Sequence, residues 1–152
     1  MSSPAVPDHV VSAVAGLVRR VKSLTNGMAT VREHRSTDVP SIIVDIQPVN
    51  PAACPITIVA EQFVILLVGA GGCRWEMSYD ETDVSTIMRV MRAVVEGSVE
   101  ERYALGRSSV RVTLDDGTVS EATTRRPLAW LSVRKNRAQR SFTIYQPYAV
   151  RA

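Results

Sequence analysis

The sequence predicts an α+β fold, in which a mainly antiparallel, curved sheet is covered on one face by two helices. Two segments, near residues 8–25 and 81–96, repeat apolar residues with the period of a helix. Much of the remaining chain alternates apolar and polar residues, which is typical of strands with one buried face. With 152 residues, of which 45% are apolar, the chain is long enough to bury one core. We therefore predict a single domain over residues 1–152.

The first helix is predicted over about residues 8–25. Pro7 and Asp8 are typical of a helix start, and Asn26 and Gly27 favour the left-handed conformation that ends a helix. The apolar residues between them recur on one face: Val10, Val11, Val14, Leu17, Val18, Val21 and Leu24.

Strands are predicted next along the chain. Residues 28–35 are polar and alternate weakly, so both an edge strand and a loop fit them. In SIIVDIQP the residues Ile42, Val44 and Ile46 alternate with their neighbours, which indicates a strand with one buried face. The run ITIVAEQFVILLV is rich in β-branched residues, and Glu61-Gln62 suits a turn between two strands. The sequence GAGG then predicts a turn into the strand CRWEMSY.

The second helix begins where the period changes from 2 to 3.6. Asp80 is a suitable cap, and Asp83 stands at the third helical position, as in a capping box. Gly97 is placed to end the helix, and Arg89 is expected to point outward. The predicted inward stripe is Val84, Ile87, Met88, Met91, Val94 and Val95.

Strand patterns return after Gly97. SVEERYAL, SVRVTL and VSEATT are predicted strands, and the DDGT between the last two is a typical hairpin turn. LAWLSV, from Leu128, and SFTIYQ, from Ser141, are the last predicted strands, on either side of the loop RKNRAQR. We interpret Glu96, Glu100 and Glu101 as a solvated face at the corner between helix and strand.

The residues that carry enzyme chemistry are few. The chain has two histidines, His9 and His34, and contains no zinc-protease, nucleophile-elbow, Walker or dinucleotide-binding motif. We interpret GAGG as a plain turn, because it lacks the helix N-terminus and the lysine of a phosphate-binding loop. The acidic group Asp80, Glu81 and Asp83 is explained by helix capping. We predict no catalytic residue, no cofactor and no metal ligand.

The cysteines and the hydropathy pattern indicate a cytoplasmic protein. Cys54 and Cys73 lack the spacing of a zinc or redox site, so we expect buried thiols, although one disulfide between them also fits. The longest apolar run, FVILLVGAGG, is about half the roughly 20 residues that span a bilayer. We expect no membrane span.

A basic segment near the C-terminus is the candidate binding region. The net charge of +3 is uneven: residues 97–152 contain ten basic and five acidic residues. Three interpretations stay open: a solvated loop, a grip for an acidic protein, or a nucleic-acid contact aided by Tyr145 and Tyr148. The candidate partner-binding residues are Arg125, Arg126, Trp130, Arg134, Lys135, Arg137 and Arg140.

The stretch RWEMSYDETDVSTIMRVMRAVVEGSVEER, followed by GRSSVRVTLDDGT, resembles small bacterial α+β immunity proteins of polymorphic toxin systems. The resemblance covers roughly residues 56–120 and lies in the order of strand, capped helix, strand and hairpin. It implies a cytoplasmic protein that binds another protein and covers its active site. It transfers no binding residue. The basic C-terminal third departs from the acidic charge expected of an inhibitor of a basic nuclease.

From these features we expect non-catalytic protein binding, of the immunity or chaperone-like kind, through an exposed sheet face and the basic segment. The alternative is a nucleic-acid-binding accessory protein that uses the same segment.

Overall fold

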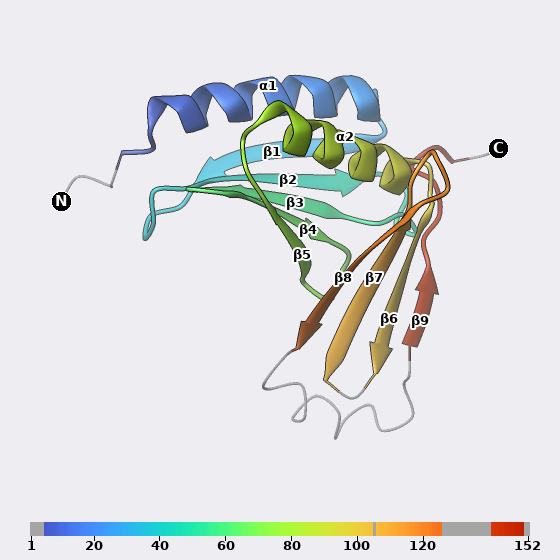
Figure 1. Ribbon diagram of the computed structural model, residues 1–152. Coiled ribbons are helices and arrows are strands. Elements are labelled where there is room, and N and C mark those ends of the chain that lie inside the picture. Colours follow the sequence, from blue (N-terminus) through green and yellow to red (C-terminus); the bar gives the residue numbers. More distant parts are fainter. Residues whose placement is uncertain (1–4, 105, 126–140, 151–152) are drawn as a thin grey trace.

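The computed structural model describes residues 5–104, 106–125 and 141–150 (Figure 1). The elements in chain order are α1 (Asp8–Thr25), β1 (Ala29–Arg35), β2 (Ile42–Pro48), β3 (Ile56–Ala60), β4 (Val64–Val68), β5 (Cys73–Met77), α2 (Glu81–Val95), β6 (Val99–Ala104), β7 (Arg107–Thr113), β8 (Val119–Arg125) and β9 (Ser141–Ile144). The expected strand LAWLSV lies outside the described residues.

The strands form two antiparallel sheets, with the orders β1-β2-β3-β4-β5 and β8-β7-β6-β9. The α+β class is confirmed, and the strands divide between two sheets where the sequence predicts one curved sheet. β5 and β8 meet through side chains: Trp75 Nε1 donates to Ser120 Oγ at 3.0 Å, and Thr124 Oγ1 donates to the Gly72 carbonyl at 3.2 Å. The weakly alternating residues 28–35 form the edge strand β1.

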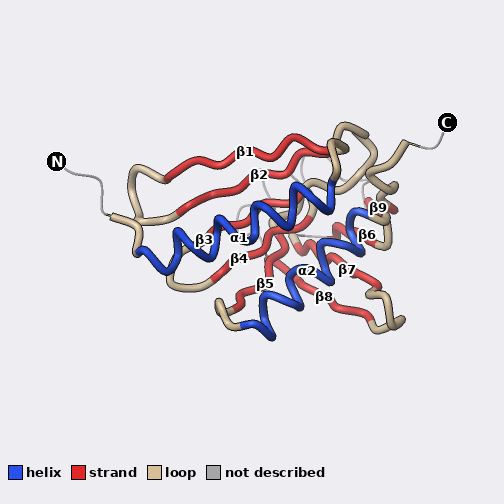
Figure 2. Tube along the Cα trace, turned by 90° about the horizontal axis from the view of Figure 1, so that it is seen from above, coloured by secondary structure: helices blue, strands red, loops and turns tan. Residues whose placement is uncertain are grey.

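Both helices lie on the same face of the five-stranded sheet, and α2 continues to the top of the four-stranded sheet (Figures 1 and 2). This arrangement follows from their apolar stripes, because each helix can bury one side only. α1 buries Val10, Val14 and Val21, and α2 buries Ile87 and Met91. The alternate residues of both sheets face the same helices, so the two sheets share one apolar core.

The predicted helix ends are confirmed. Asn26 adopts the left-handed conformation with φ of 44° after α1. At the start of α2 the Asp80 carboxylate accepts a hydrogen bond from the Asp83 backbone N–H at 2.8 Å, which holds the pKa of Asp80 below its usual range. The Asp83 carboxylate in turn accepts from the Ser78 backbone N–H at 2.7 Å. In a capping box this carboxylate would accept from the N–H of the cap residue itself, Asp80. Here it accepts from the N–H of Ser78, two residues before the cap.

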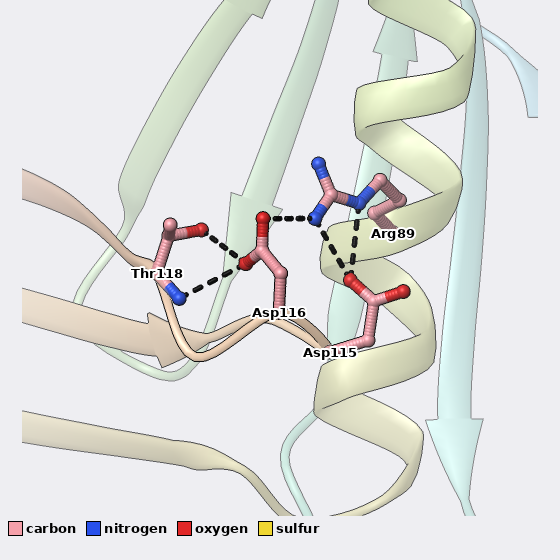
Figure 3. Close-up of polar contacts among 4 residues, drawn as sticks. All are labelled: Arg89, Asp115, Asp116 and Thr118. Carbon is pink, nitrogen blue, oxygen red and sulfur yellow. Dashed lines mark hydrogen bonds and ion pairs between the residues drawn. The ribbon is translucent and has the colours of Figure 1, made fainter.

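The outward Arg89 joins α2 to the β7–β8 hairpin (Figure 3). Its Nη2 atom lies 2.8 Å from Asp115 Oδ1 and 3.0 Å from Asp116 Oδ2. Asp116 also accepts hydrogen bonds from the Thr118 hydroxyl and backbone N–H, at 2.6 Å and 2.9 Å. Chiefly through the Thr118 bonds, the pKa of Asp116 is lowered to about 2. The predicted DDGT turn is thus confirmed, and it also anchors the helix.

The hairpin anchor predicts acid sensitivity. Because the pKa of Asp116 is depressed in the folded state, its contribution to stability is present above about pH 4 and is lost as the pH falls toward 2. We expect Asp116→Asn to lower the melting temperature near pH 5 and to weaken its fall between pH 5 and 2. Thermal unfolding followed by circular dichroism measures both effects. Asp38→Asn, at an exposed loop position, is the matched control, and equal pH slopes for wild type and Asp116→Asn would contradict this role.

Candidate interaction surface

The face of the five-stranded sheet opposite the helices is covered by no helix or strand among the described residues (Figure 1). Neighbouring residues of a strand point to opposite faces, so every second residue of each strand lies on this face. We call it the open sheet face. Its residues on β1 to β5 are Thr30, Arg32, His34, Ile43, Asp45, Gln47, Thr57, Val59, Ile65, Leu67, Arg74 and Glu76.

The centre of the open sheet face is apolar. The strand register places Ile43 beside Val59, and Val59 beside Ile65, on three adjacent strands. Leu67 follows Ile65 on the same side of β4. All four side chains are half-buried, because each is shielded only by its neighbours on the sheet. Together they form a continuous apolar cluster at the centre of the sheet.

Charged side chains surround this cluster. His34 Nδ1 lies 3.7 Å from Asp45 Oδ2, and the Thr57 hydroxyl donates to Asp45 Oδ1 at 3.0 Å. On the opposite edge Arg74 lies 3.5 Å from Glu76. The two arginines and two acids of the face cancel in formal charge. An apolar centre with a polar rim is the arrangement that protein–protein interfaces use.

The apolar surface continues past one edge of the open sheet face, onto the hairpin loops. Phe63 and Val39 are 57% and 49% exposed. They line a cavity of about 570 Å³ that also includes Pro7, Ile65 and Glu76. A partner seated on the sheet could therefore contact Phe63 as well.

The outer face of the four-stranded sheet is a weaker candidate because its centre is charged. Arg111 lies between Glu100 at 3.7 Å and Glu121 at 3.6 Å. Its exposed apolar residues, Phe142, Ile144 and Val119, stand on the edge strands β9 and β8. Ion pairs already occupy the middle of this face, so burial against a partner would have to desolvate them.

The predicted partner-binding residues fall mostly outside the described part of the chain. Arg125 is the last residue of β8, where it pairs with Arg107. The structure describes no side chain at Arg125, and the following residues lie outside the described ranges: Arg126, Trp130, Arg134, Lys135, Arg137 and Arg140. Their role in binding remains a prediction.

Tyr148 is a core residue, which corrects the expectation that it could stack on bases, whereas Tyr145 is half-buried. The Tyr148 side chain is 1% exposed, and its hydroxyl donates to the Cys54 carbonyl at 2.6 Å. The Tyr145 hydroxyl donates to Glu101 Oε1 at 2.7 Å. The Tyr148 ring therefore belongs to the core, and the Tyr145 ring lies at its border with the hydroxyl held by Glu101.

The described residues contain no group of three or more histidine, cysteine or acidic side chains placed to hold a metal ion. The ring of His9 meets Tyr79 edge-on at 6.1 Å, and Asp80 and Asp83 cap α2. Within the described ranges no helix is both long and apolar enough to cross a membrane.

Both cysteines are buried, and neither forms a disulfide. The pKa of Cys54 is raised well above its usual range, first because the thiol is buried and second because of the charge of Glu101. The expectation of buried thiols is confirmed, and the alternative of a disulfide between them does not hold in the structure.

Burial predicts unreactive thiols in the folded protein. We expect Ellman's reagent to label neither Cys54 nor Cys73 under native conditions and to label both after unfolding in guanidinium chloride, because the reagent requires an accessible thiolate. The absorbance of the released thiolate gives the count. Rapid labelling before unfolding, or no labelling after it, would show that the thiols are exposed or oxidised.

Protein-family models, curated proteins and solved structures show no match to this chain. The candidate function therefore rests on the geometry of the chain itself.

Proposed function

We propose that this protein acts by binding another protein through the open sheet face and has no catalytic activity of its own. The observation that carries the proposal is the apolar cluster of Ile43, Val59, Ile65 and Leu67, which no described helix or strand covers. A contiguous apolar patch with a charged rim is a typical mark of an interaction site. The partner presents an apolar surface of its own with few unpaired charges at its centre.

The size of the face determines how far the partner must extend. Five strands about 4.8 Å apart, with about five residues each, present a flat area of roughly 400 Å². A standard interface buries about 800 Å² on each partner. The partner must therefore reach beyond the sheet, and the exposed Phe63 adjoining Ile65 offers the nearest apolar extension.

The resemblance to immunity proteins supports a more specific form of this proposal. An immunity, inhibitor or chaperone-like protein works by covering a surface of a toxin or effector, which requires shape and apolar contact more than reactive groups. The open sheet face supplies both features. The nucleic-acid alternative has less support among the described residues, because the formal charges of the face cancel and Tyr148 is buried in the core.

A charge placed at the centre of the face tests the proposal. We expect Val59→Glu to leave the chain folded, since Val59 is only half-buried, and to weaken binding of the natural partner about thirtyfold or more, because the carboxylate would be buried unpaired. Tagged protein purified from its native host, followed by calorimetry with the recovered partner, measures the change.

Val119→Glu, the same substitution on the outer face of the four-stranded sheet, is the matched control and is expected to retain the partner. Undiminished binding by a folded Val59→Glu protein would refute the proposal. If instead the chain binds a DNA duplex with an affinity that falls steeply as salt is added, the nucleic-acid alternative gains support.

A further inference from the structure

A second candidate site lies beneath the turn between β4 and β5, on the inner face of the four-stranded sheet. A cavity of about 240 Å³ opens there, lined by Gly71, Glu101, Tyr103, Ser108 and Tyr145 among others. Polar groups of Glu101 and Ser108 share its lining with apolar surface, whereas apolar side chains fill the same sheet face nearer to α2. Polar groups in a cavity next to a packed core call for a ligand with matching hydrogen-bonding groups.

Glu101 provides the charge in this cavity. Its side chain is 8% exposed, which corrects the sequence-based interpretation of Glu101 as part of a solvated face. Val99 and Glu101 share the inner face of β6, so the period of the strand carries the acid inward. The carboxylate accepts hydrogen bonds from the backbone N–H of Ala70 at 3.2 Å and of Gly71 at 2.9 Å. The GAGG turn thus cradles an anion, which belongs to the chain itself.

The carboxylate keeps one free acceptor position. Oε1 accepts from both Ala70 N–H and the Tyr145 hydroxyl, which fills its two lone pairs, whereas within the described part of the chain Oε2 accepts from Gly71 alone. The pKa of Tyr145 is raised by burial and by its bond to Glu101, so this hydroxyl stays a donor at neutral pH. The remaining lone pair of Oε2 is available to a donor in the cavity.

Ser108 is the second polar group without full hydrogen bonding. The residue is 1% exposed, and its hydroxyl oxygen has no hydrogen-bond partner among the described residues. Burying an unpaired hydroxyl is unfavourable, because the group loses its hydrogen bonds to water, so such a group is uncommon in a folded protein unless something binds it. Ser108 lines the same cavity as Glu101.

The two open groups stand at a distance that one donor atom can bridge. A Cβ built on Gly71 would be 2.0 Å from the Ser108 hydroxyl oxygen and 2.9 Å from Glu101 Oε2, so these oxygens are about 4.9 Å apart or less. A tetrahedral nitrogen that donates two hydrogen bonds of ordinary length, about 2.9 Å each, holds its two acceptors about 4.7 Å apart. Because one of these acceptors is a carboxylate, a cationic nitrogen binds here more strongly than a neutral group.

We propose that this cavity binds the ammonium group of a small primary amine, held by Glu101 Oε2 and the Ser108 hydroxyl. The tyrosine rings of Tyr103 and Tyr145 provide the walls for a short carbon chain. This site lies apart from the open sheet face, because Glu101 and Ser108 belong to the inner face of the other sheet. The two proposals can therefore fail separately.

Propylammonium chloride is the probe, with n-propanol as the neutral molecule of the same shape and potassium chloride as the salt control. Each is titrated to about 50 mM into the nitrogen-15-labelled full chain near neutral pH, because a ligand of so few atoms binds weakly. We expect saturable shifts of the Gly71 and Ser108 amide resonances with propylammonium and no saturable shift with propanol or salt.

Variants separate binding from a structural role. Ser108→Ala is expected to weaken propylammonium binding about tenfold or more, the effect of one hydrogen bond to a charged group. Ser109→Ala, on the opposite face of the same strand, is the matched control and is expected to bind as the wild type does. Glu101→Gln is expected to abolish the preference for propylammonium over propanol. If propylammonium gives no saturable shift, or if Ser108→Ala binds it unchanged, the site is not an amine site.

Discussion

The whole architecture depends on one constraint: two sheets and two helices must bury their apolar faces in a single core. α2 meets this constraint by lying over the five-stranded sheet and reaching the inner face of β7. Once both helices occupy the same side, no described helix or strand is left for the opposite face. The open sheet face is therefore a consequence of the packing, and its cluster of Ile43, Val59, Ile65 and Leu67 is the surface on which the proposed function depends.

Glu101 provides a further polar link between the two sheets, beside those between β5 and β8. Its carboxylate accepts hydrogen bonds from backbone N–H groups of the β4–β5 turn, which belongs to one sheet. It also accepts one from the hydroxyl of Tyr145, the residue that follows β9 in the other sheet. The turn can approach so closely only because it contains glycine: a Cβ at Gly69 would come within 2.6 Å of the carboxylate, and one at Gly71 within 2.0 Å of Ser108. The glycines that the sequence analysis explains as a flexible turn are thus required by contact with an anion.

Local patterns in the sequence are enough to predict most elements of the fold. The apolar stripes locate α1 and α2. The helix ends at Asn26 and Asp80, and the hairpin at DDGT, are also predictable, because capping and turn formation depend on near neighbours. The division into two sheets depends on which distant strands form hydrogen bonds, which alternation does not encode. The same limit explains why the sequence does not reveal that Glu101 is buried: its partners, Ala70 and Tyr145, lie about thirty and forty residues away in the chain.

The sequence predicts an exposed sheet face as the binding surface, but not which residues lie together at its centre. Alternation in β2 to β4 shows that Ile43, Val59 and Ile65 point away from the buried residues, whereas the register that brings them side by side comes from the structure. The basic segment attracts attention in the sequence because its charges are consecutive. Apolar residues distributed over three strands give no such local signal, although they form the more coherent surface.

The most direct test of the central claim is the solvent exposure of isoleucine methyl groups in the free protein, measured by NMR with a soluble gadolinium chelate. Ile43 and Ile65 should relax strongly, as the exposed Ile144 does, whereas the buried Ile58 should be unaffected. On addition of the natural partner, Ile43 and Ile65 should become protected while Ile144 stays exposed. If Ile43 and Ile65 are as protected as Ile58 in the free chain, the sheet has no open face and the account is wrong.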